Sequence, residues 1–151
     1  VAGPERAASR GLRGSLPRAR RRLLCGAAVL LASSKALLAL AGLGRAVQLA
    51  RLLGRACPPY HRVEAVEQVP WAVEAVASRL PGQFDCLGRA VAGNALLAAS
   101  GYDARIRLGV NKLDGAFEAH AWVEYDDEVL IGDLDDLDRF RALPEPEVPS
   151  V

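Results

Sequence analysis

The sequence predicts an α+β fold in which helices come first and a small antiparallel sheet follows. Over residues 23–100, apolar residues recur at helical spacing, in segments separated by proline and glycine. Over residues 105–131 the pattern changes to alternation, which is typical of half-buried strands. Two turn-forming pairs, Asp114-Gly115 and Asp126-Asp127, divide this part into three strands. We therefore expect a sheet of consecutive strands packed on a helix.

Length and composition fit one domain with an appended segment. Of the 151 residues, 51% are apolar, which is enough for a core. The 19 basic and 18 acidic residues nearly cancel, but residues 1–22 hold seven arginines and one acid, and residues 124–147 hold ten acids and two arginines. Three cysteines cannot all pair, and two histidines do not supply a zinc site. We therefore expect a reducing, cytoplasmic setting and no metal or other cofactor.

The chain divides into four predicted segments. Residues 1–22 form a basic arm without an apolar period, which we expect to be disordered. Nucleic-acid binding is not expected there, because no aromatic platform accompanies the arginines. Residues 23–56 form amphipathic helices broken near Gly42. Residues 60–141 form the main domain, and residues 142–151 are a tail rich in proline and glutamate.

Two further expectations concern the first helical segment. Membrane contact of residues 23–53 is an alternative to docking on the domain, because an apolar run follows the arginines. Lys35 makes it the less favoured one, since a charge at the bilayer centre costs about 2.5–3.5 kcal/mol. The docked helix is expected to have a polar side, marked by Arg45, Arg51 and Arg55, and an apolar side, made by Val47, Leu49, Leu52 and Leu53.

A second helical pattern runs from about residue 61 to Leu80. Its valines recur near helical spacing, and Trp71 joins them as an expected core residue. Pro70 interrupts the pattern, which predicts two short helices.

The first candidate functional residue is Cys86. Asp85 is a good N-cap and Gly101 a natural C′ residue, so the segment between them reads as one helix with Cys86 at its first position. The unsatisfied N–H groups and the macrodipole at a helix N-terminus stabilise a thiolate. A buried structural cysteine is the alternative interpretation.

The second candidate is His120, on the predicted strand from Phe117 to Tyr125. Alternation places His120 and Trp122 on one face of this strand and the neighbouring alanines and valine on the other. A thiolate on the helix and an imidazole on the strand would form a Cys–His pair if the sheet packs on that helix. His61 is a second candidate base, but its proline-led context favours a surface role.

An acid that orients the imidazole would complete such a site. Asp133 follows the third strand, where a tight hairpin brings the chain beside His120. Asp135, Asp136 and Glu124 are rivals on spacing alone.

At these residues the sequence resembles the lasso peptide B proteins, the transglutaminase-like leader peptidases of lasso peptide biosynthesis. The resemblance lies in Cys86-Leu87 opening a helix, Gly101, the Leu-Gly-Val block at residues 108–110, and Ala-His-Ala-Trp-Val-Glu at residues 119–124. It covers residues 60–135 well and the upstream helices loosely. It implies a papain/transglutaminase-like fold and a catalytic triad of Cys86, His120 and Asp133.

The implied activity is removal of the leader from a ribosomal precursor peptide, before a separate ATP-dependent cyclase closes the ring. The short chain resembles the split form of the family, in which a small recognition protein delivers the leader. The Cys86 backbone N–H would hold the oxyanion, with Gln83 or Trp122 as a second donor. The alternatives are another Cys–His enzyme, such as an amidase or acyltransferase, and a non-catalytic peptide-binding module.

The sequence departs from the family pattern at two places. The family often has proline two residues after the cysteine, where this chain has Gly88. The turn Asp126-Asp127-Glu128 is more acidic than the usual glycine-containing turn and reads as one residue longer, which shifts the register before Asp133. This shift bears on which acid stands beside His120.

Overall fold

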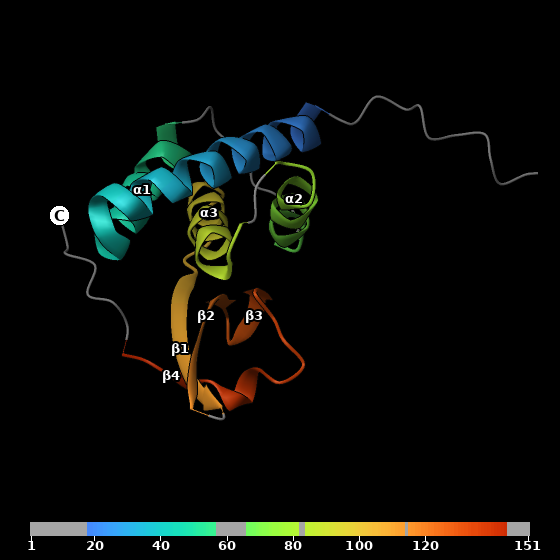
Figure 1. The fold of residues 1–151 in the computed structure, drawn as a ribbon. Coiled ribbons are helices and arrows are strands. Elements are labelled where there is room, and N and C mark those ends of the chain that lie inside the picture. The colour runs from blue at the N-terminus through green and yellow to red at the C-terminus, as the bar shows by residue number, and fades with distance from the viewer. Residues whose placement is uncertain (1–17, 57–65, 82–83, 114, 145–151) are drawn as a thin grey trace, which may run out of the picture.

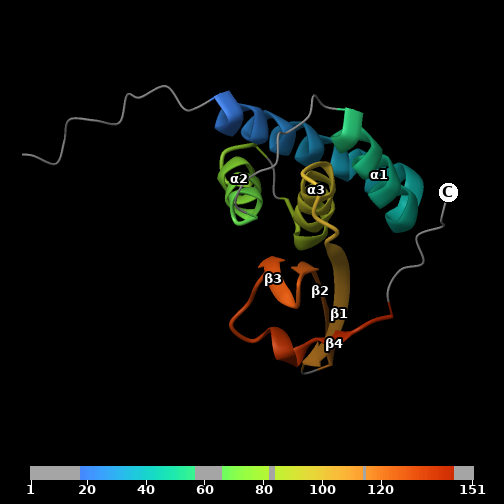
Figure 2. The same ribbon diagram turned by 180° about the vertical axis from the view of Figure 1, so that it is seen from behind.

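A computed structural model of the chain describes residues 18–56, 66–81, 84–113 and 115–144. It has the predicted α+β fold, with the helices gathered on one side of a small sheet (Figure 1). Helix α1 lies across α2 and α3, and α3 lies between α1 and the sheet, as the view from behind also shows (Figure 2). The elements in chain order are α1 (Arg18–Ala56), α2 (Gln68–Ala77), α3 (Cys86–Ala99), β1 (Arg105–Leu113), β2 (Ala116–Tyr125), β3 (Glu128–Ile131), a 3-10 turn η1 (Leu137–Arg139) and β4 (Arg141–Ala142).

Helix α3 is the central element and contacts α1, α2 and the sheet. Its small residues allow close packing, since a Cβ on Gly54 of α1 would lie 2.9 Å from the Ala95 carbonyl oxygen. The helix ends at Ala99, and Gly101 is the C′ residue as predicted, with a left-handed φ of 90°. The Tyr102 N–H donates to the Leu97 carbonyl, which completes a Schellman motif.

Helix α1 begins at Arg18, so the predicted boundary between arm and helix lies too late. Residues 1–17 lie outside the described residues. The predicted break is confirmed at Gly42, whose φ of 71° and ψ of 170° are not helical. Among the described helices, α1 alone is long and apolar enough to cross a membrane by length and composition, a test that core helices and signal sequences also pass.

The predicted faces of the second half of α1 are wrong in part: Arg45 and Arg55 are exposed and Val47 is buried, as predicted, but the three leucines and Arg51 are not on the predicted sides. Leu49, Leu52 and Leu53 are exposed, whereas the residues that pack on α3 are small ones such as Ala50 and Gly54, together with Val47. Arg51 points inward and donates from Nε to Asn94 Oδ1 at 2.9 Å and from Nη2 to the Ala104 carbonyl at 3.0 Å. The second half of α1 packs so closely on α3 that mainly small side chains fit between the two helices, and the larger leucines lie on the outer side.

Helix α2 is one helix in the described residues, and Pro70 lies in its first turn. Proline is tolerated there because the first N–H groups of a helix have no partner within the helix. Trp71 is 38% exposed and is not a core residue. Its ring instead holds the Arg20 guanidinium of α1, with Cζ 4.0 Å from the ring centroid.

The sheet has the strand order β3-β2-β1-β4 and is antiparallel throughout. In the β1–β2 hairpin the pairing extends to Leu113 opposite Ala116, so β2 begins one residue before its predicted start at Phe117. Asp114 lies outside the described residues, and Gly115 has a φ of 86°. Strand β4 pairs with β1 through Ala142 opposite Gly109, so the predicted tail begins later than residue 142.

The hairpin between β2 and β3 explains the anticipated shift in register. Asp126 and Asp127 have positive φ values of 52° and 62° and form a two-residue turn, as predicted, so the turn is not the source of the extra residue. The shift comes instead from a β-bulge, because Glu124 pairs with Val129 but Val123 pairs with Ile131.

Candidate active site

Cys86 is the first residue of α3, as the sequence predicts. Asp85 caps the helix from an extended conformation, and its Oδ1 accepts from the Gly88 N–H at 2.8 Å. The Cys86 thiol is half-buried and is not in a disulfide. The local sequence thus places a sulfur beside the free N–H groups of a helix N-terminus.

Gly88 is a close-approach position. A Cβ there would lie 3.0 Å from Asp85 Oδ1 and 3.2 Å from the Oγ of Ser34, a fully buried residue of α1. A side chain at this position would therefore crowd the capping carboxylate and the Ser34 hydroxyl. This crowding is a physical reason for glycine at a position where the resembled family often has proline. Proline would also remove the N–H that donates to the Asp85 cap.

Replacing Gly88 with valine is expected to lower the free energy of unfolding by about 1–3 kcal/mol, because the side chain must displace Asp85 and Ser34. Urea denaturation measures the change. Ala98→Val, at a half-buried position of the same helix, reports the effect of a β-branched residue without this crowding. Equal losses in the two variants would contradict the explanation.

His120 lies on β2, and its ring is held by one hydrogen bond and two aromatic neighbours. Its Nε2 lies 2.6 Å from the Gly132 carbonyl oxygen. A carbonyl only accepts, so Nε2 must carry the proton, and in the neutral ring the Nδ1 lone pair is then the basic site. The ring centroids of Trp122 and Phe140 lie 6.1 Å and 5.4 Å from that of His120.

The four candidate acids have different surroundings. Asp133 is exposed, and the hydrogen bond of Nε2 goes to the carbonyl of the residue before it. Glu124 accepts from the Trp122 indole at 2.7 Å and forms an ion pair with Arg107 at 3.1 Å, so its carboxylate is engaged away from His120. Asp136 forms an ion pair with Arg139 in η1, and Asp135 is exposed.

Cys86, His120 and Asp133 line one cavity of about 530 Å³. Helix α3 and strand β2 therefore direct the predicted nucleophile and base into the same space. Among the described residues, no hydrogen bond joins the Cys86 thiol to the imidazole. Such contacts often form only when substrate is bound.

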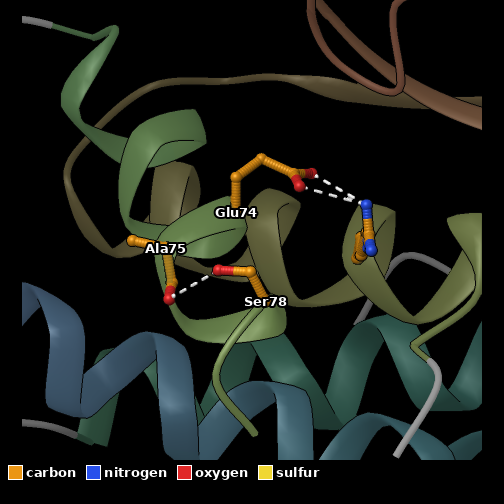
Figure 3. A network of polar contacts seen from close by, with 4 residues as sticks. Glu74, Ala75 and Ser78 are labelled. Carbon is orange, nitrogen blue, oxygen red and sulfur yellow. Dashed lines mark hydrogen bonds and ion pairs between the residues drawn. The ribbon is translucent and has the colours of Figure 1, made fainter.

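The rest of the cavity wall includes both apolar and charged side chains. Phe84, Leu130 and Leu134 supply apolar surface. Glu74 of α2 and Arg89 of α3 also line the cavity, and they form an ion pair at 3.0 Å. Figure 3 shows the Glu74 carboxylate reaching from α2 toward its partner on the neighbouring helix. A peptide segment also carries apolar and charged groups, so this wall is compatible with a bound peptide.

The remaining predicted residues do not join the site. The Trp122 indole N–H is bound to Glu124, and Trp122 does not line the cavity, so this geometry does not offer it as an oxyanion donor. Gln83 and His61 lie outside the described residues. The Gly132 carbonyl and Phe140, which both contact the His120 ring, are not predicted by the sequence pattern. A glycine directly after an apolar strand was the available signal for the first.

A helix that opens with cysteine and an antiparallel strand that carries histidine, facing one cavity, define a thiol-enzyme architecture. The sequence matches the Transglutaminase-like superfamily over residues 27–145, and the chain belongs to this superfamily. Its members are commonly cysteine proteases or acyltransferases. Comparisons with curated proteins and with solved structures gave no match.

Proposed function

We propose that this protein is a cysteine peptidase that removes the leader from a ribosomal lasso precursor peptide before macrocyclisation. The observation that carries the proposal is the convergence of Cys86 and His120 on one cavity in a transglutaminase-like chain. The choice of substrate is supported by the resemblance of residues 119–124 to the lasso peptide B proteins.

The proposed chemistry uses the Cys86 thiol, the His120 imidazole and the start of α3. Nδ1 of His120 takes the thiol proton, and Cys86 Sγ attacks the scissile carbonyl carbon to form a tetrahedral oxyanion. The backbone N–H of Cys86, free at the helix start, donates to that oxyanion. The imidazolium then gives its proton to the leaving amine, which leaves a thioester on Cys86. Water hydrolyses the thioester and restores the thiol.

The partners follow from the same proposal. The substrate is the precursor peptide, delivered by a separate small leader-recognition protein, and the cleaved core passes to an ATP-dependent cyclase. The reaction needs no cofactor, because acyl transfer through a thiol requires only the base and the oxyanion donors. We place the protein in the cytoplasm, where its thiols stay reduced.

The test is incubation of the purified chain with a lasso precursor peptide and the recognition protein, followed by mass spectrometry. Leader release is expected as two fragments whose masses sum to that of the precursor plus one water. Iodoacetamide should abolish it. A Cys25→Ser variant, altered at an exposed thiol of α1, should remain active and remain sensitive to the reagent.

Other outcomes select the alternatives. A product in which an acyl group is joined to an added amine would identify an acyltransferase, and release of ammonia from a side-chain amide would identify an amidase. Binding of the precursor without any change in mass would identify a non-catalytic binding module. Each of these results contradicts the peptidase proposal.

A further inference from the structure

We propose that the outer face of α1 binds the surface of a membrane that contains anionic lipids. This surface lies apart from the candidate active site, so the inference goes beyond the proposed function and does not depend on it. Two properties of α1 support it: large apolar side chains are turned away from the domain, and basic residues occur without any acid.

The inner face of α1 packs on α3 along both halves of the helix. In the first half, Ser34 lies so close to α3 that a Cβ on Gly88 would be 3.2 Å from its Oγ. In the second half, a Cβ on Gly54 would be 2.9 Å from the Ala95 carbonyl oxygen. The opposite faces of both halves therefore turn away from α3 and from the sheet on its other side (Figure 1).

The outer face carries large apolar side chains that the domain leaves exposed. Leu40, beside the break at Gly42, is 88% exposed, and Val29 in the first half is 52% exposed. In the second half, helical spacing places the exposed Leu49 and Leu52 on the side away from α3. Insertion of these side chains into the interface of a bilayer would remove them from water, which is favourable.

The charges on α1 are all of one sign. Residues 18–56 contain eight arginine and lysine residues and neither aspartate nor glutamate. All eight are exposed except Arg51, which is turned inward and donates to Asn94. Every acidic residue that the structure describes comes after α1 in the chain, from Glu67 onward. An anionic lipid surface is therefore complementary in charge to this layer of the molecule.

The fold favours a position of α1 on the membrane surface over one across the bilayer. Leu23, Leu30 and Leu31 are buried in the core, so a helix that crossed the bilayer would have to leave the domain and uncover them. A helix that lies on the surface also keeps the exposed Lys35 away from the bilayer centre, where a charge is costly. Exposed apolar and basic side chains together are typical of helices that lie in the interface of anionic membranes.

Membrane binding through this face would leave the candidate active site open. In the described part of the chain, no residue of α1 lines the cavity that holds Cys86 and His120. The cavity is bounded by residues of α2, by the start of α3 and by the sheet side of the molecule. Variants on the outer face of α1 should therefore keep the activity of the site in solution.

Co-sedimentation of the full chain with vesicles tests the proposal. Vesicles of phosphatidylcholine that also contain phosphatidylglycerol are expected to bind the protein at least about tenfold more tightly than vesicles of phosphatidylcholine alone. Added salt should weaken this binding, because it screens the attraction between the basic residues and the lipid head groups.

Substitutions separate the apolar from the basic contribution. Leu49→Gln/Leu52→Gln is expected to weaken vesicle binding by about tenfold or more, and Arg45→Gln by about fivefold, the scale for one basic residue near an anionic surface. Leu113→Gln and Arg141→Gln are the matched controls, because both residues are exposed on the sheet, and they should leave binding unchanged. Urea denaturation checks that each variant is folded.

A fluorophore on Cys25 gives a second readout that leaves the leucines and arginines intact. Cys25 is exposed, and helical spacing places it on the same side of α1 as Val29. In a Cys57→Ser/Cys86→Ser protein the label is confined to this thiol. Its emission is expected to shift to shorter wavelength with vesicles that contain phosphatidylglycerol, and to stay unchanged with phosphatidylcholine alone.

Three results would overturn the inference. The first is equal binding to the two kinds of vesicle, or binding to neither. The second is a loss of binding in Leu113→Gln as large as that in Leu49→Gln/Leu52→Gln. The third is a dimer without lipid that the double variant dissociates, which would show that a second copy covers this face. Because vesicle binding needs no precursor peptide, failure of the proposed peptidase activity would be recorded separately, as absence of leader release.

Discussion

Replacing Cys86 with alanine is expected to abolish leader release, with a fall in kcat of about 10⁶-fold, the loss seen when a peptidase nucleophile is removed. The methyl group cannot form the thioester on which the proposed route depends. The alanine also keeps the helix start intact, because the Asp85 cap binds the Gly88 N–H and makes no use of the thiol. Quenched-flow or endpoint mass spectrometry measures the loss.

Binding of the precursor should survive this change, since the apolar cavity wall at Phe84, Leu130 and Leu134 is untouched. Fluorescence anisotropy of a labelled precursor measures the affinity of both forms. Cys25→Ala is the control, because that thiol is exposed on α1 and does not line the cavity. Cleavage at an undiminished rate by Cys86→Ala would remove the nucleophile from the proposal.

Replacing Asn94 with leucine is expected to lower the free energy of unfolding by about 2–4 kcal/mol, although the two side chains branch at the same carbon. Asn94 is buried in α3, where its Nδ2 donates to the Ala104 carbonyl at 2.7 Å and its Oδ1 accepts from Arg51 at 2.9 Å. Leucine has neither the amide donor nor the amide acceptor. Nε of the part-buried Arg51 guanidinium therefore loses its hydrogen-bond acceptor. Urea denaturation measures the loss.

The double variant Arg51→Leu/Asn94→Leu separates the two parts of this cost. Removal of the guanidinium also removes the unpaired charge, so the double variant should be less destabilised than the sum of the single ones. Leu52→Gln is the control for the helix itself, because Leu52 is 59% exposed and should change stability by less than about 0.5 kcal/mol. Additive losses would show that Arg51 and Asn94 are not coupled.

Local signals in the sequence were sufficient for much of the fold. The Asp85 cap, the Gly101 C′ residue and the Asp126-Asp127 turn each act within a few residues, and the structure confirms all three. The faces of α1 were not readable in this way. Leucine, alanine and arginine occur all around that helix, so the side that packs was decided by the shape of α3 and by the acceptor that Asn94 offers to Arg51.

The site shows the same division. The positions of Cys86 and His120 follow from a helix start and from strand alternation, and both line the cavity. The partner of the imidazole depends on a β-bulge and on a main-chain oxygen. Every residue has a main-chain carbonyl, and its position depends on the folded backbone. The residue types in a sequence therefore do not show which carbonyl contacts the imidazole. The catalytic roles themselves stay predictions until the variants are measured.

The two ends of the sheet bear on how the protein behaves at high concentration. An outer strand leaves a row of free N–H and C=O groups that a strand of another molecule could pair with. Here the outer strands are β3, with four residues and an irregular register, and β4, with two. In the described residues β4 pairs only with Gly109 and Val110 of the nine-residue β1, so most of the outer edge of β1 is left for a strand of another molecule to pair with.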